Sequence, residues 1–162
     1  MHSMDGLGRL YVAQERYEEA EEQFIKGIDA GNRWLAGKNH PATLRIINDL
    51  AVLRKKQKQY QDAERLFREA LEARSLKLGE DHPDTLESKN DLAVLYREQA
   101  RYEDAERLLM EALKGREAKL GPGHPDTIES LKQLVTLYES WGKPDEAKKW
   151  RAKLPETNAA ER

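Results

Sequence analysis

Three histidines recur at one fixed interval and are the first residues to consider for metal chemistry. His40, His82 and His124 each precede a proline, and they follow one another at intervals of 42 residues. One zinc ion needs its ligands about 2 Å away, whereas equivalent positions of neighbouring packed helices lie on the order of 10–20 Å apart. We therefore interpret the histidines as residues that precede helix starts, and we expect no metal site and no cofactor.

No arrangement of side chains indicates catalysis. The chain has no cysteine, which excludes disulfides, thiolate nucleophiles and cysteine-based zinc sites. It has no glycine-rich loop followed by Lys-Ser/Thr and no H-E-x-x-H motif. Carboxylate pairs such as Glu18–Glu19 and Glu103–Asp104 fall at expected helix starts, where negative charge complements the helix dipole. We expect a protein that is not an enzyme.

The charge balance and hydropathy exclude two further classes. The chain carries 28 basic and 30 acidic side chains, a net charge of −2, which argues against a nucleic-acid or anionic-membrane binder. No apolar run reaches the roughly 18 residues of a membrane span, and the N-terminus lacks the apolar segment of a signal peptide. A cytoplasmic location is expected.

The elements that must position any site repeat along the chain. The segment Tyr102–Ala105 recurs as Tyr60–Ala63, Tyr17–Ala20 and Pro144–Ala147, at intervals of 42 or 43 residues. Such a period indicates small units that bury their apolar faces by stacking on one another. The apolar spacing is helical rather than alternating, and it predicts helices over 41–57, 60–77, 83–99 and 102–119. Each unit is therefore expected to be a helical hairpin, and Gly37, Gly79 and Gly121 are expected to end the second helices in a left-handed conformation.

The small and aromatic residues of the unit resemble the tetratricopeptide repeat. Its order of leucine, small residue, tyrosine, tyrosine, alanine, bulky apolar residue and alanine is met by Leu92, Ala93, Tyr96, Tyr102, Ala105, Leu109 and Ala112. The usual unit has about 34 residues. The longer unit here, with L-G-x-x-H-P-D-T before the first helix and N-D-L-A within it, looks like the kinesin light chain variety, which also occurs in bacterial regulatory proteins. The resemblance implies an all-α fold, a right-handed α-solenoid of helix-turn-helix repeats.

The period divides the chain into one array followed by a tail. We expect a single array over 5–153, with repeats over about 5–38, 39–80, 81–123 and 124–153, and a disordered tail over 154–162. Gly27 and Gly31 predict that the second helix of the first repeat is the least regular. No H-P-D-T segment precedes the first repeat, so we expect the array to be a fragment of a longer protein.

Stacked hairpins of this type place the first helix of each repeat on a concave surface, which is the expected binding site. In kinesin light chains, the asparagine that matches Asn48 and Asn90 lies in the groove that binds cargo peptides. An asparagine amide can both donate to and accept from a peptide backbone; the alternative is that these asparagines only face solvent. The basic run from Arg54 to Lys58 is either an electropositive groove wall or a favourable charge at a helix end. The candidate groove residues are Asn48, Asn90, Arg9, Arg45, Val52, Lys55, Lys56, Val94, Arg97 and Lys132.

The function predicted from these features is a non-catalytic scaffold that binds a peptide or protein segment in the concave groove, and we expect this segment to be acidic. One alternative is a self-assembly module acting through its open repeat ends, with weak homo-oligomers forming at the N-terminal end, where Leu7, Leu10 and Tyr11 lack an upstream neighbour. Another alternative, which depends on the family resemblance alone, is a sensor or regulatory segment of a larger multidomain protein. The sequence predicts no nucleic-acid or membrane partner.

Overall fold

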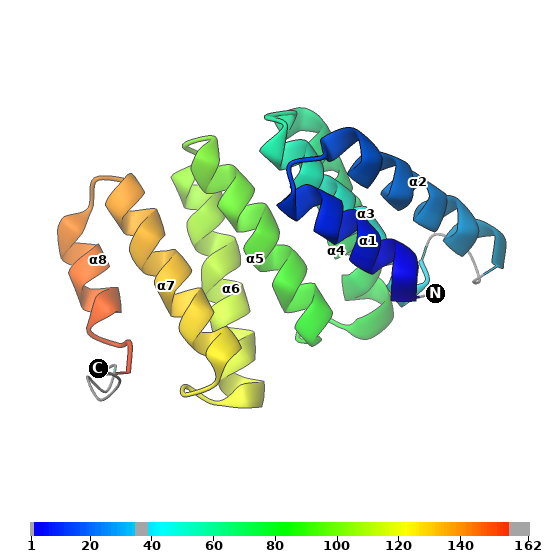
Figure 1. The fold of residues 1–162 in the computed structure, drawn as a ribbon. Coiled ribbons are helices and arrows are strands. Elements are labelled where there is room, and N and C mark those ends of the chain that lie inside the picture. Colours follow the sequence, from blue (N-terminus) through cyan, green and yellow to red (C-terminus); the bar gives the residue numbers. More distant parts are fainter. Residues whose placement is uncertain (1, 35–38, 156–162) are drawn as a thin grey trace, which may run out of the picture. The chain divides into compact units, whose positions relative to one another are not determined.

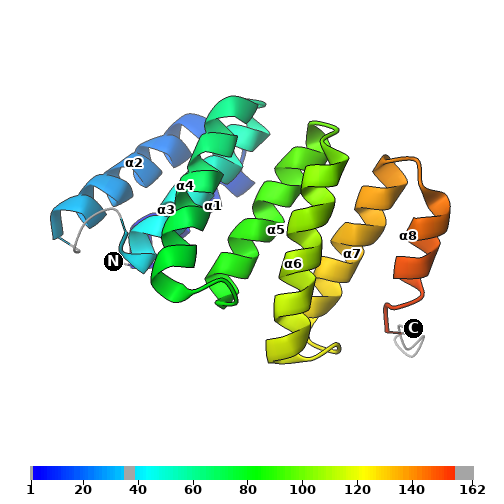
Figure 2. The ribbon, with the colours of Figure 1, turned by 180° about the vertical axis from the view of Figure 1, so that it is seen from behind.

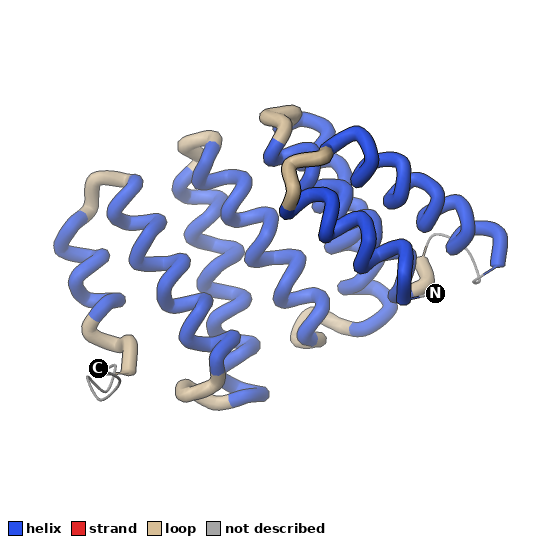
Figure 3. Tube along the Cα trace, in the orientation of Figure 1, coloured by secondary structure: helices blue, strands red, loops and turns tan. Residues whose placement is uncertain are grey.

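A computed structural model describes residues 2–34 and 39–155, with side chains over 6–33 and 39–155. Helices and short loops account for all of these described residues, and no strand occurs among them (Figures 1 and 3). The chain divides into two compact units, Met1–Asp91 and Leu92–Arg162, and the division falls within one helix. The all-α prediction is confirmed.

The first unit contains two helical hairpins and the beginning of a third. Its helices are α1 (His2–Ala13), α2 (Tyr17–Trp34), α3 (Pro41–Lys56), α4 (Tyr60–Leu78) and the part of α5 (Pro83–Glu98) that ends at Asp91. Helices α1 and α2 pack together, as do α3 and α4, and α2 also packs against α3 (Figure 1). Each hairpin therefore lies against the next within this unit.

The second unit contains the rest of α5, followed by α6 (Tyr102–Leu120), α7 (Pro125–Ser140) and α8 (Pro144–Arg151). Helices α7 and α8 form a hairpin, and α7 also packs against α6 (Figure 2). Helix α8 has 8 residues, whereas α6 has 19. The second helix of the last hairpin is thus the shorter one, and a proline follows it at position 155, which disfavours helical conformation in the residue before it.

The three repeated histidines lie at the starts of α3, α5 and α7. The Nδ1 atoms of His40, His82 and His124 accept hydrogen bonds of 3.2 Å from the backbone N–H groups of Ala42, Asp84 and Asp126. Each histidine thereby satisfies one of the N–H groups that a helix start leaves without an intrahelical partner. Their interpretation as residues that precede helix starts is confirmed.

The turn inside each hairpin contains one residue with positive φ. Glu15, Lys58 and Ala100 have φ of 59°, 60° and 58°, and Gly142 at the equivalent position of the last repeat has φ of 72°. The backbone N–H of the following residue then closes the turn; for example, that of Arg101 donates to the carbonyl of Tyr96 at 2.8 Å. Side chains with a Cβ are strained in this region, so three of the four turns store conformational strain.

Glycines end the second helices as predicted, with φ of 91° at Gly79 and 85° at Gly121. Gly37 lies outside the described residues. The second helix of the first repeat was predicted to be irregular. This prediction is wrong for the described part of the helix, because α2 runs continuously from Tyr17 to Trp34. The tail expected to be disordered lies outside the described residues from position 156 onwards.

Small residues allow the helices to approach closely. Ala20, Ala63 and Ala105 are fully buried at equivalent positions of α2, α4 and α6. A Cβ added to Gly31 of α2 would lie 2.2 Å from Oγ1 of Thr43 on α3, and one added to Gly8 of α1 would lie 2.4 Å from the Phe24 ring. The two glycines of α2, Gly27 and Gly31, lower its helix propensity but allow it to pack closely on α3.

Candidate functional site

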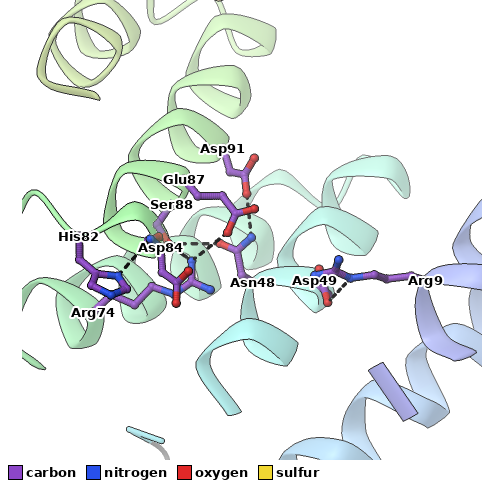
Figure 4. Close-up of polar contacts among 9 residues, drawn as sticks. All are labelled: Arg9, Asn48, Asp49, Arg74, His82, Asp84, Glu87, Ser88 and Asp91. Atoms are coloured by element: carbon purple, nitrogen blue, oxygen red, sulfur yellow. Dashed lines mark hydrogen bonds and ion pairs between the residues drawn. The ribbon is translucent and has the colours of Figure 1, made fainter. Parts of the chain in front are cut away.

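Asn48 is the first of the candidate groove residues, and it lies between two successive first helices. It is 5 % exposed on α3. Its side-chain amide donates a 2.7 Å hydrogen bond to Oδ2 of Asp91 on α5, and its carbonyl oxygen accepts a 3.4 Å hydrogen bond from the hydroxyl of Ser88 (Figure 4). Asn48 therefore does not face solvent, which was one of the two positions expected for it, because α5 covers it and uses its polar atoms.

Arg9 makes the corresponding link one helix earlier. Its Nε donates to Oδ2 of Asp49 at 2.8 Å, which connects α1 to α3. The Arg9 side chain remains 54 % exposed, whereas that of Asp49 is 13 % exposed. Figure 4 shows Arg9 reaching across from α1 to α3 beside Asn48. We call the side of α1, α3 and the start of α5 that carries Arg9, Asn48, Asp49, Glu87 and Asp91 the first-helix face.

The second unit contains a link of the same kind. Nη1 of Arg97, near the end of α5, donates to Oε1 of Gln133 on α7 at 3.5 Å. Gln133 is the counterpart of Asp91 and Asp49 in the repeat. Three candidate groove residues therefore connect successive first helices within their units.

Other candidates lie along one side of α3. Arg45, Val52 and Lys56 are separated by seven and four residues, a spacing that places them on the same side of a helix. Arg45 and Lys56 are exposed, while Val52 and the neighbouring Lys55 are half-buried. This side of α3 therefore carries three positive charges and one small apolar side chain, that of Val52.

The remaining candidates have different environments. Asn90 is half-buried, and its Oδ1 is buried without a hydrogen-bond partner among the described residues. Val94 on the second unit's part of α5 is half-buried, and Lys132 on α7 is exposed. Asn90 thus does not make the bond pattern that Asn48 makes.

A buried arginine supports the first-helix face from behind. Arg74 on α4 is 1 % exposed, and its Nη1 donates to the carbonyl of Asp84 at 2.8 Å and to Oγ of Ser88 at 2.7 Å. Because Ser88 also bonds Asn48, this arginine is connected to the face through one hydroxyl (Figure 4). In the second unit, Nη1 of Arg116 bonds the carbonyl of Asp126 and Oγ of Ser130 in the same way, at 3.0 and 2.7 Å.

Carboxylates on the first-helix face offset part of the positive charge that the sequence predicted there. Although the Glu87 side chain is 55 % exposed, partial loss of hydration raises its pKa, and repulsion from Asp91 raises it further, while Arg74 and Arg9 act in the opposite direction. Glu87 and Asp91 are one helical turn apart on α5, an arrangement in which like charges repel. The first-helix face is therefore mixed in charge rather than uniformly positive.

Sequence reasoning missed Asp49, Asp91 and the two buried arginines. A signal for the aspartates was present, because the pair Asn-Asp occurs at 48–49 and again at 90–91. Arg74 and Arg116 also recur at the repeat interval, as do Ser88 and Ser130. Polar residues repeated in register on an otherwise apolar helix indicate a structural bond between units.

The described residues contain no group of three or more histidine, aspartate or glutamate side chains that could hold a metal ion. Among the described helices, none combines the length and hydropathy needed to cross a membrane. A cavity of about 410 Å³ lies between α6 and the end of α8, next to Met110, Leu113 and Trp150. None of the candidate residues lines it.

Comparison with protein families identifies the repeat. A family model described as tetratricopeptide repeat matches residues 1–75 and 46–118. No curated protein sequence matches the chain. The matched residues cover well over half of the chain and include all the helices from α1 to α5.

Solved structures show the same fold at low sequence identity. A putative kinesin light chain from Podosopora anserina, with nearly identical TPR-like repeats, aligns at a TM-score of 0.83 and 24 % identity, over 94 % of this chain and 72 % of that one. BtubC (BKLC) from P. vanneervenii aligns at a TM-score of 0.78 and 24 % identity, over 92 % of this chain and 62 % of that one. The pilF protein of Pseudomonas aeruginosa aligns at a TM-score of 0.60 and 18 % identity, over 93 % of this chain and 57 % of that one. The chain thus spans less than two thirds of two of these proteins, and the likeness concerns the fold: a kinesin light chain-like helical repeat of the solenoid class.

Proposed function

We propose that this chain, which belongs to the tetratricopeptide repeat family, binds a peptide or protein segment across its first-helix face. Tetratricopeptide repeats generally mediate protein–protein interactions, and scaffolds of this family are typically non-catalytic. The proposal goes further by assigning the contact to named side chains of α1, α3 and α5. It treats the chain as a scaffold rather than an enzyme.

The observation that carries the proposal is the pair of links Arg9–Asp49 and Asn48–Asp91. These bonds hold α1, α3 and the start of α5 at a set spacing before any ligand arrives. A surface that is ordered in advance loses less conformational entropy on binding. Arg45, Val52 and Lys56 then form the contact line along α3, with Lys55 beside it.

The charge of the ligand follows from the positions of the charged groups. We assign acidic residues of the segment to Arg45 and Lys56 on α3. The part of the segment that crosses α5 is neutral or basic, because Glu87 and Asp91 would repel a carboxylate there. The sequence predicted an acidic ligand for the whole groove, whereas this assignment expects acidic residues only in the part of the ligand that contacts α3.

Asn48 has a supporting role in this proposal. Its amide is committed to Asp91 and its carbonyl to Ser88, so it positions α5 instead of holding the peptide backbone. Asn90, Val94, Arg97 and Lys132 stay predicted contacts for a longer segment. They form a second set of positions for mutation.

A peptide library selected against the whole chain tests the proposal. A selected peptide should lose about tenfold in affinity, on the order of 1.4 kcal/mol, when Arg45→Glu and Lys56→Glu are combined. The matched control reverses two arginines on second helices, Arg65→Glu and Arg107→Glu, whose side chains are 65 % and 64 % exposed. Equal losses in the two double variants would overturn the proposal, because they would reflect net charge alone.

Two other hypotheses stay predictions. Self-assembly through the open repeat ends predicts a mass that increases with concentration, which light scattering measures. A regulatory segment of a larger protein predicts activity changes in that protein when the repeats are deleted.

A further inference from the structure

A continuous chain of hydrogen bonds runs from a buried cation on α4 to a carboxylate on the first-helix face. Nη1 of Arg74 donates to Oγ of Ser88 at 2.7 Å. The Ser88 hydroxyl donates to Oδ1 of Asn48 at 3.4 Å, and the Asn48 amide donates to Oδ2 of Asp91 at 2.7 Å (Figure 4). Every bond has its donor on the arginine side, so the chain has one direction, from positive charge to negative charge.

The arginine at the start of this chain depends on few contacts. Arg74 is 1 % exposed, and its Nε is buried without a hydrogen-bond partner among the described residues. Burial of a charge is costly unless the charge is paired and hydrogen-bonded, so the guanidinium relies on the contacts of Nη1. These are Ser88, the carbonyl of Asp84 at 2.8 Å and the carboxylate of Glu87 at 3.7 Å. The position of Ser88 is therefore fixed from α4.

The direction of the chain fixes the orientation of the Asn48 side chain. Its two ends differ, because the carbonyl oxygen only accepts hydrogen bonds and the amide nitrogen only donates them. With a hydroxyl proton on one side and a carboxylate on the other, only one of the two amide orientations satisfies both neighbours. Hydrogen bonds in such a chain also polarise one another. Arg74 thus influences the bond that joins α3 to α5 by acting through Ser88.

The repeat shows that the first helix itself does not require this hydroxyl. Ile46 occupies the position of Ser88 on α3, and Ser130 occupies it on α7. The Ser130 hydroxyl accepts a 2.7 Å hydrogen bond from Arg116, a bond of the same kind as in the first unit. Serine therefore occurs at this position where a buried arginine is present to bond it.

We propose that Arg74 is a positioning residue for the first-helix face. Through Ser88 and Asn48 it sets where α5 presents Asp91, and it thereby raises the affinity for the bound segment without touching that segment. This inference rests on the proposed function and adds to it a determinant on a second helix. The affinity of a face is proportional to the population of its binding-competent arrangement, which is the quantity that Arg74 controls.

The second unit provides a matched control. Arg116 is 8 % exposed and bonds a backbone carbonyl at 3.0 Å as well as Ser130. Asn90, the counterpart of Asn48, has a buried Oδ1 without a hydrogen-bond partner in the described part of the chain. Arg116→Met should therefore cost about as much stability as Arg74→Met, but it should leave the arrangement of Asn48 unchanged.

A peptide selected from a library against the whole chain is the probe, titrated far below the unfolding temperature of each variant. Arg74→Met and Ser88→Ala should each weaken its affinity about fivefold, which corresponds to a binding-competent population of about one fifth. Arg116→Met and Ser130→Ala should bind the peptide as the parent does. The two serine variants keep the test valid if an arginine variant does not fold.

Two further readouts separate positioning from a general loss of stability. Without peptide, the side-chain amide resonances of Asn48 should shift in Ser88→Ala and stay unchanged in Ser130→Ala. In the Asn48→Ala background, Ser88→Ala should cause no further loss of affinity, because residues in one hydrogen-bond network are coupled.

Three results would overturn the inference. They are equal affinity losses in Arg74→Met and Arg116→Met, unchanged Asn48 resonances in Ser88→Ala, and additive losses when Ser88→Ala is combined with Asn48→Ala.

Failure of the proposed function gives a different result. The variant that combines Arg45→Glu with Lys56→Glu would then bind the peptide as its matched control does. A shifted Asn48 resonance in Ser88→Ala, together with that result, would remove the contact line on α3 and still support the positioning of Asn48 from α4.

Discussion

The side-chain amide of Asn48 on α3 donates a 2.7 Å hydrogen bond to the carboxylate of Asp91 on α5. This bond joins two first helices that are separated by an entire second helix in the sequence. An asparagine amide could bind a ligand, but here the amide of Asn48 is used to set the spacing between α3 and α5 on the first-helix face.

Asn48→Ala should therefore destabilise the protein by about 1.5–3 kcal/mol, because a hydrogen bond to a charged, partly buried group is lost. Asn90→Ala is the control, since the Oδ1 of Asn90 makes no hydrogen bond within the described part of the chain; its cost should be less than about 1 kcal/mol. Urea unfolding followed by circular dichroism measures both. Equal costs for the two variants would contradict the structural role of Asn48.

Ser130→Ala tests the buried arginine of the second unit. The hydroxyl of Ser130 accepts a 2.7 Å hydrogen bond from Arg116, which is 8 % exposed. Removal of this acceptor should cost about 1.5–3 kcal/mol in the free energy of unfolding. Thr136→Ala, at an exposed hydroxyl that bonds its own helix backbone, should cost less than about 0.5 kcal/mol. A Ser130 variant as stable as the Thr136 variant would show that Arg116 does not need this bond.

Ala100→Gly should stabilise the protein by about 1 kcal/mol, because alanine at φ of 58° is strained and glycine is not. Gly142→Ala makes the reverse change at the equivalent turn, where φ is 72°, and should destabilise the protein by a similar amount. If the two turns behave alike, the thermal unfolding temperature should rise in Ala100→Gly and fall in Gly142→Ala. A loss of stability in Ala100→Gly would refute this account of the turns.

Glu87→Gln should change the dependence of stability on pH. Partial loss of hydration and the charge of Asp91 raise the pKa of Glu87 in the folded protein, so the folded state holds the proton more tightly than the unfolded state. The resulting contribution to stability is present below the usual glutamate pKa and is lost as the pH rises through the raised value. The variant should therefore gain stability relative to the parent between pH 4 and pH 7 in urea titrations. A stability difference that is constant over this range would contradict the raised pKa.

Much of the fold could be predicted because the repeat constrains each helix several times. The predicted helix over 41–57 corresponds to Pro41–Lys56, and that over 102–119 corresponds to Tyr102–Leu120. Proline and histidine at the helix starts, alanine at close contacts and glycine at helix ends each have a local physical cause. Positive φ at Lys58 and Ala100 has no such local signal, because the turn is imposed by the packing of the two helices it joins.

The candidate site was predicted less completely than the fold. Helical spacing is sufficient to assign Arg9, Asn48 and Arg97 to the side where first helices meet. It does not give the distance between those helices, and that distance decides whether Asn48 faces a ligand or Asp91. The carboxylates were overlooked for the same reason, since their pairing with Arg9 and Asn48 depends on the neighbouring helix.

Mapping of a bound, library-selected peptide by amide chemical shifts tests the central claim most directly. The account predicts that the shifts of Arg45, Val52 and Lys56 change on titration, while those of Arg65 and Leu76 on α4 do not. Affinity should also decrease with added salt, because exposed charges are screened beyond about 8 Å at physiological ionic strength. Shift changes confined to second helices, with α3 unaffected, would contradict binding across the first-helix face.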